Sequence, residues 1–182
     1  WFGDLVDATT GGPPLYLYNF PQMTGITFSP DLVRRLVAAA PGRIVGAKDS
    51  SGDTEYAAEL ARIPDFDIFP SDEATLSEAP ARGFAGCISA TANVTSAEAA
   101  ALRASPGDAA RRDSLRACRA AIASWPLVPA VKHLVARLHG DPAFARPLPP
   151  LAPVTAEARQ ALDAVDLAAL AAEEGQTTGR TT

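Results

Sequence analysis

The sequence predicts an α/β protein built on a parallel sheet, and three observations lead to this prediction. Short apolar runs alternate with longer stretches that carry apolar residues at helical spacing. The short runs are apolar on both faces, which is typical of strands that crossover helices cover in a parallel sheet. Polar residues gather where the short runs end, and ligands bind at the carboxyl ends of parallel strands.

Four strand-and-helix units follow one another between residues 14 and 105. Ser29 followed by Pro30 is a typical helix start, and Asp53 is a second candidate N-cap. Gly83 is expected to end the third helix, and Thr95 to cap the fourth. The predicted strands are 14–20, 43–49, 66–71 and 85–93, and the predicted helices are 29–40, 53–63, 72–83 and 95–105.

The rest of the chain is predicted to be helical almost to its end. Helical spacing indicates three further helices, at about 107–122, 127–139 and 155–172. Residues 173–182 carry no apolar anchor and are predicted to be a disordered tail. The predicted organisation is therefore a sheet-and-helix part over 1–105, a helical extension over 106–172, and the tail.

Composition excludes several classes of partner. The 182 residues are enough to bury a sizeable core. The net charge is −5 and no block of Lys or Arg stands out, which makes nucleic acid and anionic membranes poor partners. No apolar run approaches the roughly 18 residues of a membrane span, and no signal peptide is visible. We therefore expect a cytoplasmic protein.

The histidines and cysteines do not predict a metal site. His133 and His139 are six residues apart in one predicted helix, which places them on different faces. Cys87 and Cys118 lie far apart in no ligand-like spacing, and we expect both to be reduced thiols. The chemistry of this chain is therefore expected to need neither metal nor histidine.

Four strand-and-helix units followed by helices fit two architectures. One is an open doubly wound sheet, and the other is part of a (β/α)8 barrel; the pattern alone does not choose between them. In both, the carboxyl ends of the strands are the candidate site. The polar residues at these ends are Tyr18 and Asn19, Lys48 and Asp49, Ser71 to Glu73, and Ser89 to Asn93.

Lys48 closes an apolar run that is predicted to be a buried strand. Lysine is among the residues least often buried, so its place here needs a reason. One interpretation is a strand that has simply reached the surface. The other is a nucleophile, because an amine must be neutral to attack a carbonyl and burial disfavours the ammonium form.

Four short motifs, in this order and spacing, carry a family resemblance. They are YNFP (18–21), GAKDSSGD (46–53), SDE (71–73) and GCISATAN (86–93). Together they resemble the dihydrodipicolinate synthase / N-acetylneuraminate lyase family, whose members are class I pyruvate aldolases on a (β/α)8 TIM barrel. The resemblance continues to about residue 170. It implies the second half of such a barrel, about four βα units, followed by C-terminal helices.

The resemblance also implies roles for individual residues. Lys48 would form a covalent imine with pyruvate or another 2-oxo acid, without a cofactor, and Tyr18 would relay protons. The backbone carbonyl of Ile88 would line the pyruvate site. Asp72 and Glu73 would hold hydroxyls of the substrate, although acids at this place are equally typical of a helix N-terminus. The implied partners are a 2-oxo acid, an aldehyde and, at full length, further copies of the protein in a homo-oligomer.

One departure from the family pattern concerns the aldehyde. Dihydrodipicolinate synthases carry an arginine shortly after the YN.P motif, where it holds the carboxylate of the aldehyde substrate. The matching position here is Met23, which cannot make that contact. The favoured reaction is therefore the cleavage or formation of a 2-keto-3-deoxy sugar acid or a similar compound. A 4-hydroxy-tetrahydrodipicolinate synthase is the alternative.

A second departure concerns the family's first half. Its four strands, with a Gly-Thr-Thr loop that binds the pyruvate carboxylate, have no counterpart here; ATTGG (8–12) precedes the Tyr18 strand and does not match that loop. An open half-barrel would leave about eight inward side chains unburied, at ~1.5–3 kcal/mol each. That loss rivals the stability of a whole domain. We therefore expect a fragment of a longer gene product, with a non-catalytic half-barrel that acts as an interaction module as the alternative.

Overall fold

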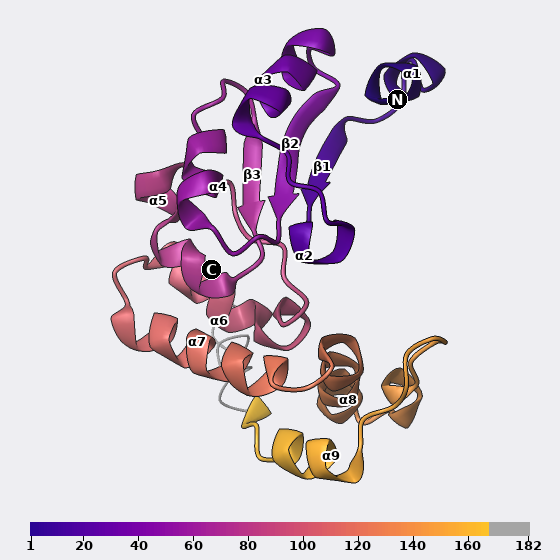
Figure 1. Ribbon diagram of the computed structural model, residues 1–182. Coiled ribbons are helices and arrows are strands. Elements are labelled where there is room, and N and C mark those ends of the chain that lie inside the picture. The colour runs from indigo at the N-terminus through magenta and orange to yellow at the C-terminus, as the bar shows by residue number, and fades with distance from the viewer. Residues whose placement is uncertain (168–182) are drawn as a thin grey trace, which may run out of the picture. The chain divides into compact units, whose positions relative to one another are not determined.

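The computed structural model describes residues 1–167 of the chain (Figure 1). The chain forms two compact units, Trp1–Ile88 and a second unit that begins at Ser89. The predicted tail, 173–182, and the end of the last predicted helix lie outside the described residues. Each unit is described by itself below.

The first unit contains a parallel sheet with the strand order β1-β2-β3. Its strands are β1 (Leu15–Asn19), β2 (Ile44–Asp49) and β3 (Asp67–Pro70). Both pairings are parallel, and three of the four predicted strands are present. The predicted α/β class is therefore confirmed, and the sheet is consistent with part of a barrel.

Two crossover helices connect these strands, and both begin where the sequence predicts. In α3 (Pro30–Ala39) the Ser29 side chain accepts the N–H of Leu32. In α4 (Thr54–Leu60) the Asp53 side chain accepts two backbone N–H groups of the first turn. Each cap satisfies donors that have no partner within the helix.

Four shorter helical segments complete the unit. They are α1 (Phe2–Ala8), α2 (Pro21–Thr24), the 3₁₀ segment η1 (Glu73–Ser77) and α5 (Ala79–Arg82). The helix predicted over 72–83 is thus split in two, and it ends at Gly83 in the left-handed conformation, as predicted. The N-terminal helix α1 is not predicted from the sequence.

The prediction of a fourth strand over 85–93 is wrong. The segment runs beside β3, because the N–H of Ala85 donates to Ile68 O and that of Ile88 donates to Pro70 O, both at 3.0 Å. In a regular parallel ladder residue 70 would also donate back, but proline has no N–H. The segment is therefore irregular, and the structure, over the residues it describes, has three strands.

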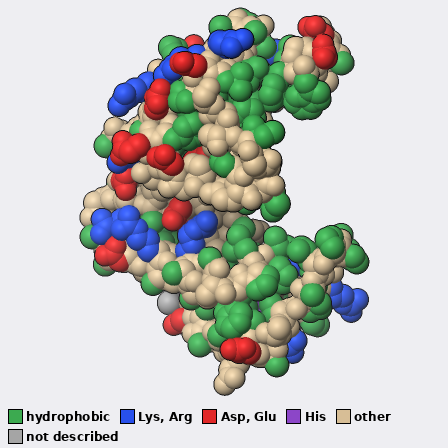
Figure 2. All heavy atoms as spheres, viewed as in Figure 1, with side chains coloured by type: hydrophobic (Ala, Val, Ile, Leu, Met, Phe, Trp, Pro, Cys, Tyr) green, Lys and Arg blue, Asp and Glu red, His purple; other side chains and the backbone are tan. Residues whose placement is uncertain are grey.

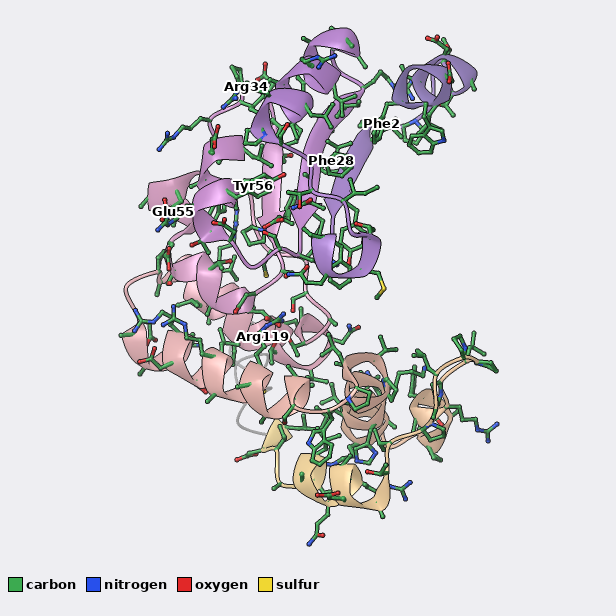
Figure 3. The ribbon with its side chains drawn as sticks, viewed as in Figure 1. Phe2, Phe28, Arg34, Glu55, Tyr56 and Arg119 are labelled. Atoms are coloured by element: carbon green, nitrogen blue, oxygen red, sulfur yellow. The ribbon has the colours of Figure 1, made fainter. Side chains whose placement is uncertain are left out.

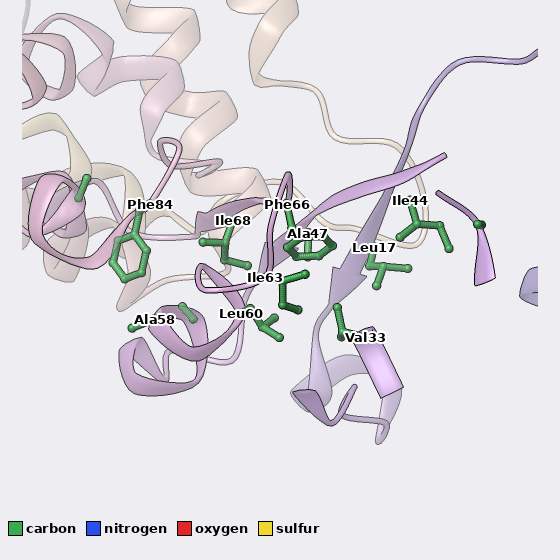
Figure 4. Packing of buried hydrophobic residues seen from close by; sticks show 13 residues of the cluster. Leu17, Val33, Ile44, Ala47, Ala58, Leu60, Ile63, Phe66, Ile68 and Phe84 are labelled. Carbon is green, nitrogen blue, oxygen red and sulfur yellow. The ribbon is translucent and has the colours of Figure 1, made fainter. Parts of the chain in front are cut away.

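One face of the sheet is covered by α3 and α4 (Figure 1). Leu17, Ala47 and Ile68, which are neighbours across the three strands, are 5%, 1% and 0% exposed on this face. Val33 of α3 and Leu60 of α4 belong to the same buried cluster (Figure 4). Each buried aliphatic side chain contributes about 1.5–3 kcal/mol, so this layer holds the unit together.

The unit is more open near its N-terminus, at the β1 edge of the sheet. Hydrophobic side chains gather beside α1 (Figure 2). They border a groove of about 300 Å³, lined by residues of α1 and β1 together with Phe28 and Ile44. The groove is largely apolar, because Trp1, Phe2, Tyr16 and Tyr18 contribute to its walls.

The second unit is helical in its described part. Val94, Ile122, Ala130, Leu134 and Leu162 form its core, contributed by four of its helices. The helix α6 begins at Ala92 rather than at the predicted 95, and Thr95 is its fourth residue instead of its cap. The elements are α6 (Ala92–Ala104), α7 (Ala109–Ala123), α8 (Leu127–His139), η2 (Pro142–Ala145) and α9 (Ala156–Asp163). Over residues 1–167, no helix has both the length and the apolar character that a membrane crossing needs.

Candidate active site

Tyr18 and Lys48 meet at the carboxyl ends of β1 and β2. The two residues are direct neighbours in the parallel register, and their side chains project from the face opposite to the buried core. Lys48 Nζ donates a hydrogen bond to Tyr18 Oη at 3.0 Å. The same nitrogen lies 4.3 Å from the centroid of the Tyr18 ring. The structure therefore brings together the two residues that the motifs singled out.

Opposing effects set the pKa of Tyr18. Partial burial disfavours the phenolate and raises the pKa. Hydrogen bonds with Lys48 and Ser50, together with the positive charge of Lys48, favour the phenolate and outweigh the burial, so the pKa of Tyr18 is lower than usual. A phenol of lowered pKa beside an amine is suited to proton transfer.

The face that carries this pair is open, in contrast to the buried setting expected for Lys48. Tyr16 and Tyr18 are 49% and 50% exposed, and Lys48 is only partly buried. The helices α3 and α4 cover the opposite face, so no layer of the first unit packs over the pair (Figure 1). In this unit the pair is therefore in contact with solvent.

A second layer of side chains lies on the same face, towards the amino ends of the strands. Tyr16 Oη donates to Asp67 Oδ2 at 3.1 Å, and the Tyr16 ring makes an edge contact with Phe69 at 5.9 Å between centroids. The Tyr16 ring lies over Gly46, where a Cβ atom would meet both the ring and the carbonyl oxygen of Asp67. Glycine at position 46 thus makes this close approach possible.

Sequence reasoning missed a buried polar pair behind Tyr18 and Lys48. Asn19 and Asp49 are 1% and 2% exposed, and Asn19 Nδ2 donates to Asp49 Oδ1 at 2.7 Å. Asn19 and Asp49 are expected from the sequence only as polar residues at the strand ends, and their pairing is not predicted. The available signal was the period of two in a strand, which turns the residue after Tyr18 and the residue after Lys48 towards the covered face.

The remaining predicted site residues lie beyond the end of β3. Asp72 Oδ1 accepts the N–H of Ala74 at 2.8 Å, so this side chain caps η1. Glu73 is buried at 1% exposed, whereas the side chain of Ile88 is 44% exposed. The N–H of Ile88 is bonded to Pro70 O, which holds the backbone at position 88 against β3. The substrate-binding roles of Asp72, Glu73 and Ile88 stay predictions.

Met23 lies in α2, directly after the end of β1. Its side chain is 74% exposed and offers no charge to a carboxylate. The neighbouring Gln22 donates from Nε2 to Ser51 O at 2.9 Å, which ties α2 to the loop after Lys48. Position 23 therefore lies in a short helix that a hydrogen bond ties to the loop after Lys48.

The histidine environment is that of a structural pair. His133 Nε2 lies 2.8 Å from Asp163 Oδ1, and Arg137 Nε approaches the same oxygen at 3.4 Å. Within residues 1–167, no cluster of three or more His, Cys, Asp or Glu side chains is arranged as a metal site.

Comparison with known proteins gives a family match over most of the chain. The profile described as the dihydrodipicolinate synthetase family matches residues 2–169. A 4-hydroxy-tetrahydrodipicolinate synthase of Dechloromonas aromatica is 45% identical over 83 residues, which is 44% of this chain and 28% of that protein. An uncharacterized DapA-like lyase of Chloroflexus aurantiacus is 34% identical over 91 residues, or 50% of this chain and 30% of the relative.

Solved structures agree with this match. Dihydrodipicolinate synthase from Agrobacterium tumefaciens superposes with a TM-score of 0.72 at 32% identity, over 81% of this chain and 51% of that one. A prophage protein of the dihydrodipicolinic acid synthase family from E. coli, in complex with pyruvate, gives 0.71 at 25% identity, over 88% and 57%. A 2-keto-3-deoxygluconate aldolase of Sulfolobus solfataricus gives 0.72 at 19% identity, over 88% and 55%, which shows a shared fold. The chain thus spans about half of these structures, and the matched segments cover under a third of the curated relatives.

Proposed function

The chain belongs to the dihydrodipicolinate synthetase family, and we propose that it carries the Schiff-base centre of a class I pyruvate aldolase. Lys48 is the proposed nucleophile, and Tyr18 is the proposed proton relay. The observation that carries this proposal is the 3.0 Å contact between Lys48 Nζ and Tyr18 Oη on the open face of the sheet.

The proposed reaction starts with the neutral amine of Lys48. It attacks the keto carbon of pyruvate or another 2-oxo acid, and loss of water leaves an imine. The imine accepts the electron pair of an adjacent C–H or C–C bond and becomes an enamine, which can attack an aldehyde carbon. Tyr18 Oη passes the proton to and from the aldehyde oxygen. Water then releases the product from Lys48, so the reaction needs no cofactor.

The open face of the sheet raises the question of what shields Tyr18 and Lys48 from water during the reaction. The solved relatives are about twice as long as the matched part of this chain, and we propose that the remainder of a (β/α)8 barrel closes over Tyr18 and Lys48. Closure would remove water and favour the neutral amine. The proposed complete protein is a cytoplasmic homo-oligomer, and the proposed partners are a 2-oxo acid and an aldehyde. The pyruvate bound to the E. coli relative supports the first of these.

For the aldehyde we propose a sugar-acid fragment derived from a 2-keto-3-deoxy acid. Met23 offers no positive charge to a carboxylate, which disfavours aspartate semialdehyde. Asp72 and Glu73 are the proposed partners of substrate hydroxyls, and the carbonyl of Ile88 is the proposed wall of the pyruvate site. A 4-hydroxy-tetrahydrodipicolinate synthase is the second candidate, because a relative of that name is 45% identical over the matched segment.

A non-catalytic interaction module is a candidate of a different class. The open sheet face and the groove beside α1 favour it, because both offer apolar surface to another chain. The two classes differ in one cheap observation: only the aldolase requires a reactive amine at position 48.

Reductive trapping tests the proposal. The chain contains two lysines, Lys48 and Lys132, so Lys132→Ala is a matched control. With the proposed remainder of the barrel present, pyruvate with borohydride should leave a reduced adduct that peptide mapping places on Lys48. The adduct should disappear in Lys48→Ala and persist in Lys132→Ala. An adduct that survives in Lys48→Ala would assign the reaction to another amine and refute the proposal.

A further inference from the structure

Two polar side chains are buried directly behind the Tyr18–Lys48 pair. Asn19 follows Tyr18 and Asp49 follows Lys48, so both side chains turn to the helix-covered face of the sheet. Only 1% of Asn19 and 2% of Asp49 is exposed. Burying a carboxylate costs free energy unless it is fully hydrogen-bonded, so the hydrogen-bond partners of Asp49 have to be identified.

The chemistry of the neighbours fixes the orientation of the Asn19 amide. Its Nδ2 donates to Asp49 Oδ1 at 2.7 Å, and its Oδ1 accepts the N–H of Phe28 at 3.3 Å. A carboxylate only accepts and a backbone N–H only donates, so turning the amide round would lose both bonds. The bond between Asn19 and Asp49 therefore joins the carboxyl ends of β1 and β2 at one defined register.

Asp49 is held from its other side by the loop that follows it. Ser51 donates its N–H to Oδ1 at 3.2 Å and its hydroxyl to Oδ2 at 2.8 Å. The Ser51 hydroxyl oxygen accepts the N–H of Asp53 at 3.1 Å. Asp53 in turn caps α4 by accepting the N–H of Tyr56 at 3.0 Å.

Tyr56 closes the chain of hydrogen bonds. Its Oη donates to the carbonyl oxygen of Phe28 at 2.7 Å, and Figure 3 shows both residues on this part of the first unit. Burial raises the pKa of Tyr56, and the charges of Asp49 and Glu59 raise it further, so the phenol keeps its proton and continues to donate. The closed circuit consists of Asn19, Asp49, Ser51, Asp53, Tyr56 and Phe28.

We propose that Asn19 and Asp49 are positioning residues, which hold Tyr18 Oη and Lys48 Nζ within reach of each other by fixing the ends of β1 and β2. The inference rests on the proposed function in taking this pair as the reacting groups. No helix of the first unit packs over the pair, so its geometry depends on the two strand ends that carry it. Reacting groups must be held within about 0.5 Å, and a shift of about 1 Å can cost roughly 100-fold in rate.

The first test follows the ionisation of Tyr18 by ultraviolet absorbance. Tyr18→Phe identifies its transition, and Asn19→Ala and Asp49→Ala break the circuit. If β1 and β2 move apart, Tyr18 loses the hydrogen bond and charge of Lys48, and its pKa should rise in both variants. Gln22→Ala is the matched control, because it removes an exposed bond to the same loop from outside the circuit and should leave Tyr18 unchanged.

The second test measures the rate of reductive trapping with pyruvate. With the remainder of the barrel present, we expect a loss of about 10- to 100-fold in Asn19→Ala and Asp49→Ala, with the adduct still on Lys48. The double variant Asn19→Asp with Asp49→Asn exchanges acceptor and donor, and should recover part of the rate that Asn19→Asp alone loses by placing two carboxylates together. That rescue would not follow from a general loss of stability.

The results that would overturn the proposal are distinct from a failure of the proposed function. If Asn19→Ala and Asp49→Ala lower the melting temperature but match Gln22→Ala in Tyr18 ionisation, the circuit is structural and the proposal is refuted. If the protein with the remainder of the barrel present and without substitutions forms no adduct at all, the aldolase function fails. The Tyr18 titration then still decides whether the circuit positions the pair.

Discussion

The two faces of the β1–β2–β3 sheet are built from alternate residues of the same strands, yet they differ in exposure and in the types of side chain they carry. On the covered face, Leu17, Ala47 and Ile68 are at most 5% exposed beneath α3 and α4. On the open face, Tyr16 and Tyr18 are about half exposed, at 49% and 50%. Because successive side chains of a strand point to opposite faces, adjacent residues of one strand lie in these two different environments.

The difference teaches that stability and proposed chemistry reside on opposite sides of one sheet. The covered face carries small and aliphatic side chains that suit close packing. The open face carries an amine, phenols and a glycine, which a core built only for packing would not select. Substitutions on the two faces should therefore affect different measurements, and four predictions test that separation.

The largest effect is expected on the covered face. Ile68→Ala removes a fully buried side chain and leaves a cavity, so the free energy of unfolding should fall by about 2–5 kcal/mol. Chemical denaturation followed by circular dichroism measures it. Tyr18→Phe on the open face should change the same quantity by no more than about 0.5 kcal/mol. Equal losses in the two variants would contradict the separation.

A second prediction concerns the rim of the open face. A bidentate contact to a carboxylate contributes about 1.5–3 kcal/mol, so Met23→Arg should raise turnover of aspartate semialdehyde roughly 10- to 150-fold. A steady-state assay with pyruvate measures it, and unfolding should be unchanged because Met23 is 74% exposed. Efficient turnover without the substitution, and no gain with it, would restore the 4-hydroxy-tetrahydrodipicolinate synthase assignment.

Gly46→Ala should be an exception to this separation, because it changes an open-face position but should lower the free energy of unfolding. The new Cβ would lie 2.5 Å from the carbonyl oxygen of Asp67, which is backbone and cannot swing aside, and would also meet the Tyr16 ring. Although position 46 is part of the open-face row, we expect a loss of about 1–3 kcal/mol from overpacking. Adding Tyr16→Ala should not rescue it. Full rescue would show that only the ring is in the way.

The smallest effect is expected in alkaline titration. Tyr18 should ionise first, because Lys48 and Ser50 lower its pKa despite partial burial. The hydrogen bond to Asp67 raises the pKa of Tyr16, and burial raises that of Tyr56. Lys48→Met should raise the pKa of Tyr18, since only the effect of burial and the Ser50 bond would remain. An unchanged first transition would contradict the contact.

The raised pKa of Tyr56 also predicts how the free energy of unfolding depends on pH. Because the pKa of Tyr56 is raised in the fold, the protonated phenol contributes stability below the ordinary tyrosine pKa of about 10. That contribution is lost as the pH rises further. The free energy of unfolding should therefore begin to fall above pH ~10, and less so in Tyr56→Phe.

Much of the fold was predictable because local signals agree with the tertiary structure. The apolar runs before Asn19 and Asp49 are strands, and the caps at Ser29 and Asp53 start helices where expected. The prediction of a fourth strand over 85–93 was wrong because the missing N–H donor is that of Pro70. Pro70 lies on the neighbouring strand β3 and not in the segment from which the strand was predicted. The helix α1 escaped prediction because it has no side-chain cap.

The site shows the same limit. The Tyr18–Lys48 contact was predictable, because two strand ends at matching positions meet when the strands pair in parallel. The pair behind it was not, because an isolated Asn or Asp after an aromatic or a lysine is more typical of a turn. What marks Asn19 and Asp49 as a buried pair is the hydrogen bond between them, which joins positions 30 residues apart. A single sequence does not show that bond.

The spacing of Tyr18 and Lys48 also matters for how the centre is assembled. The two residues are 30 positions apart and are joined by a single crossover through α3. The entropy of closing such a loop grows only with the logarithm of its length, so doubling it would cost about 0.6 kcal/mol. An insertion at the turn around Gly42, between α3 and β2, would therefore barely disturb the contact. The proposed reactive pair is therefore carried by a single βαβ unit, whose crossover could lengthen with little effect on the contact.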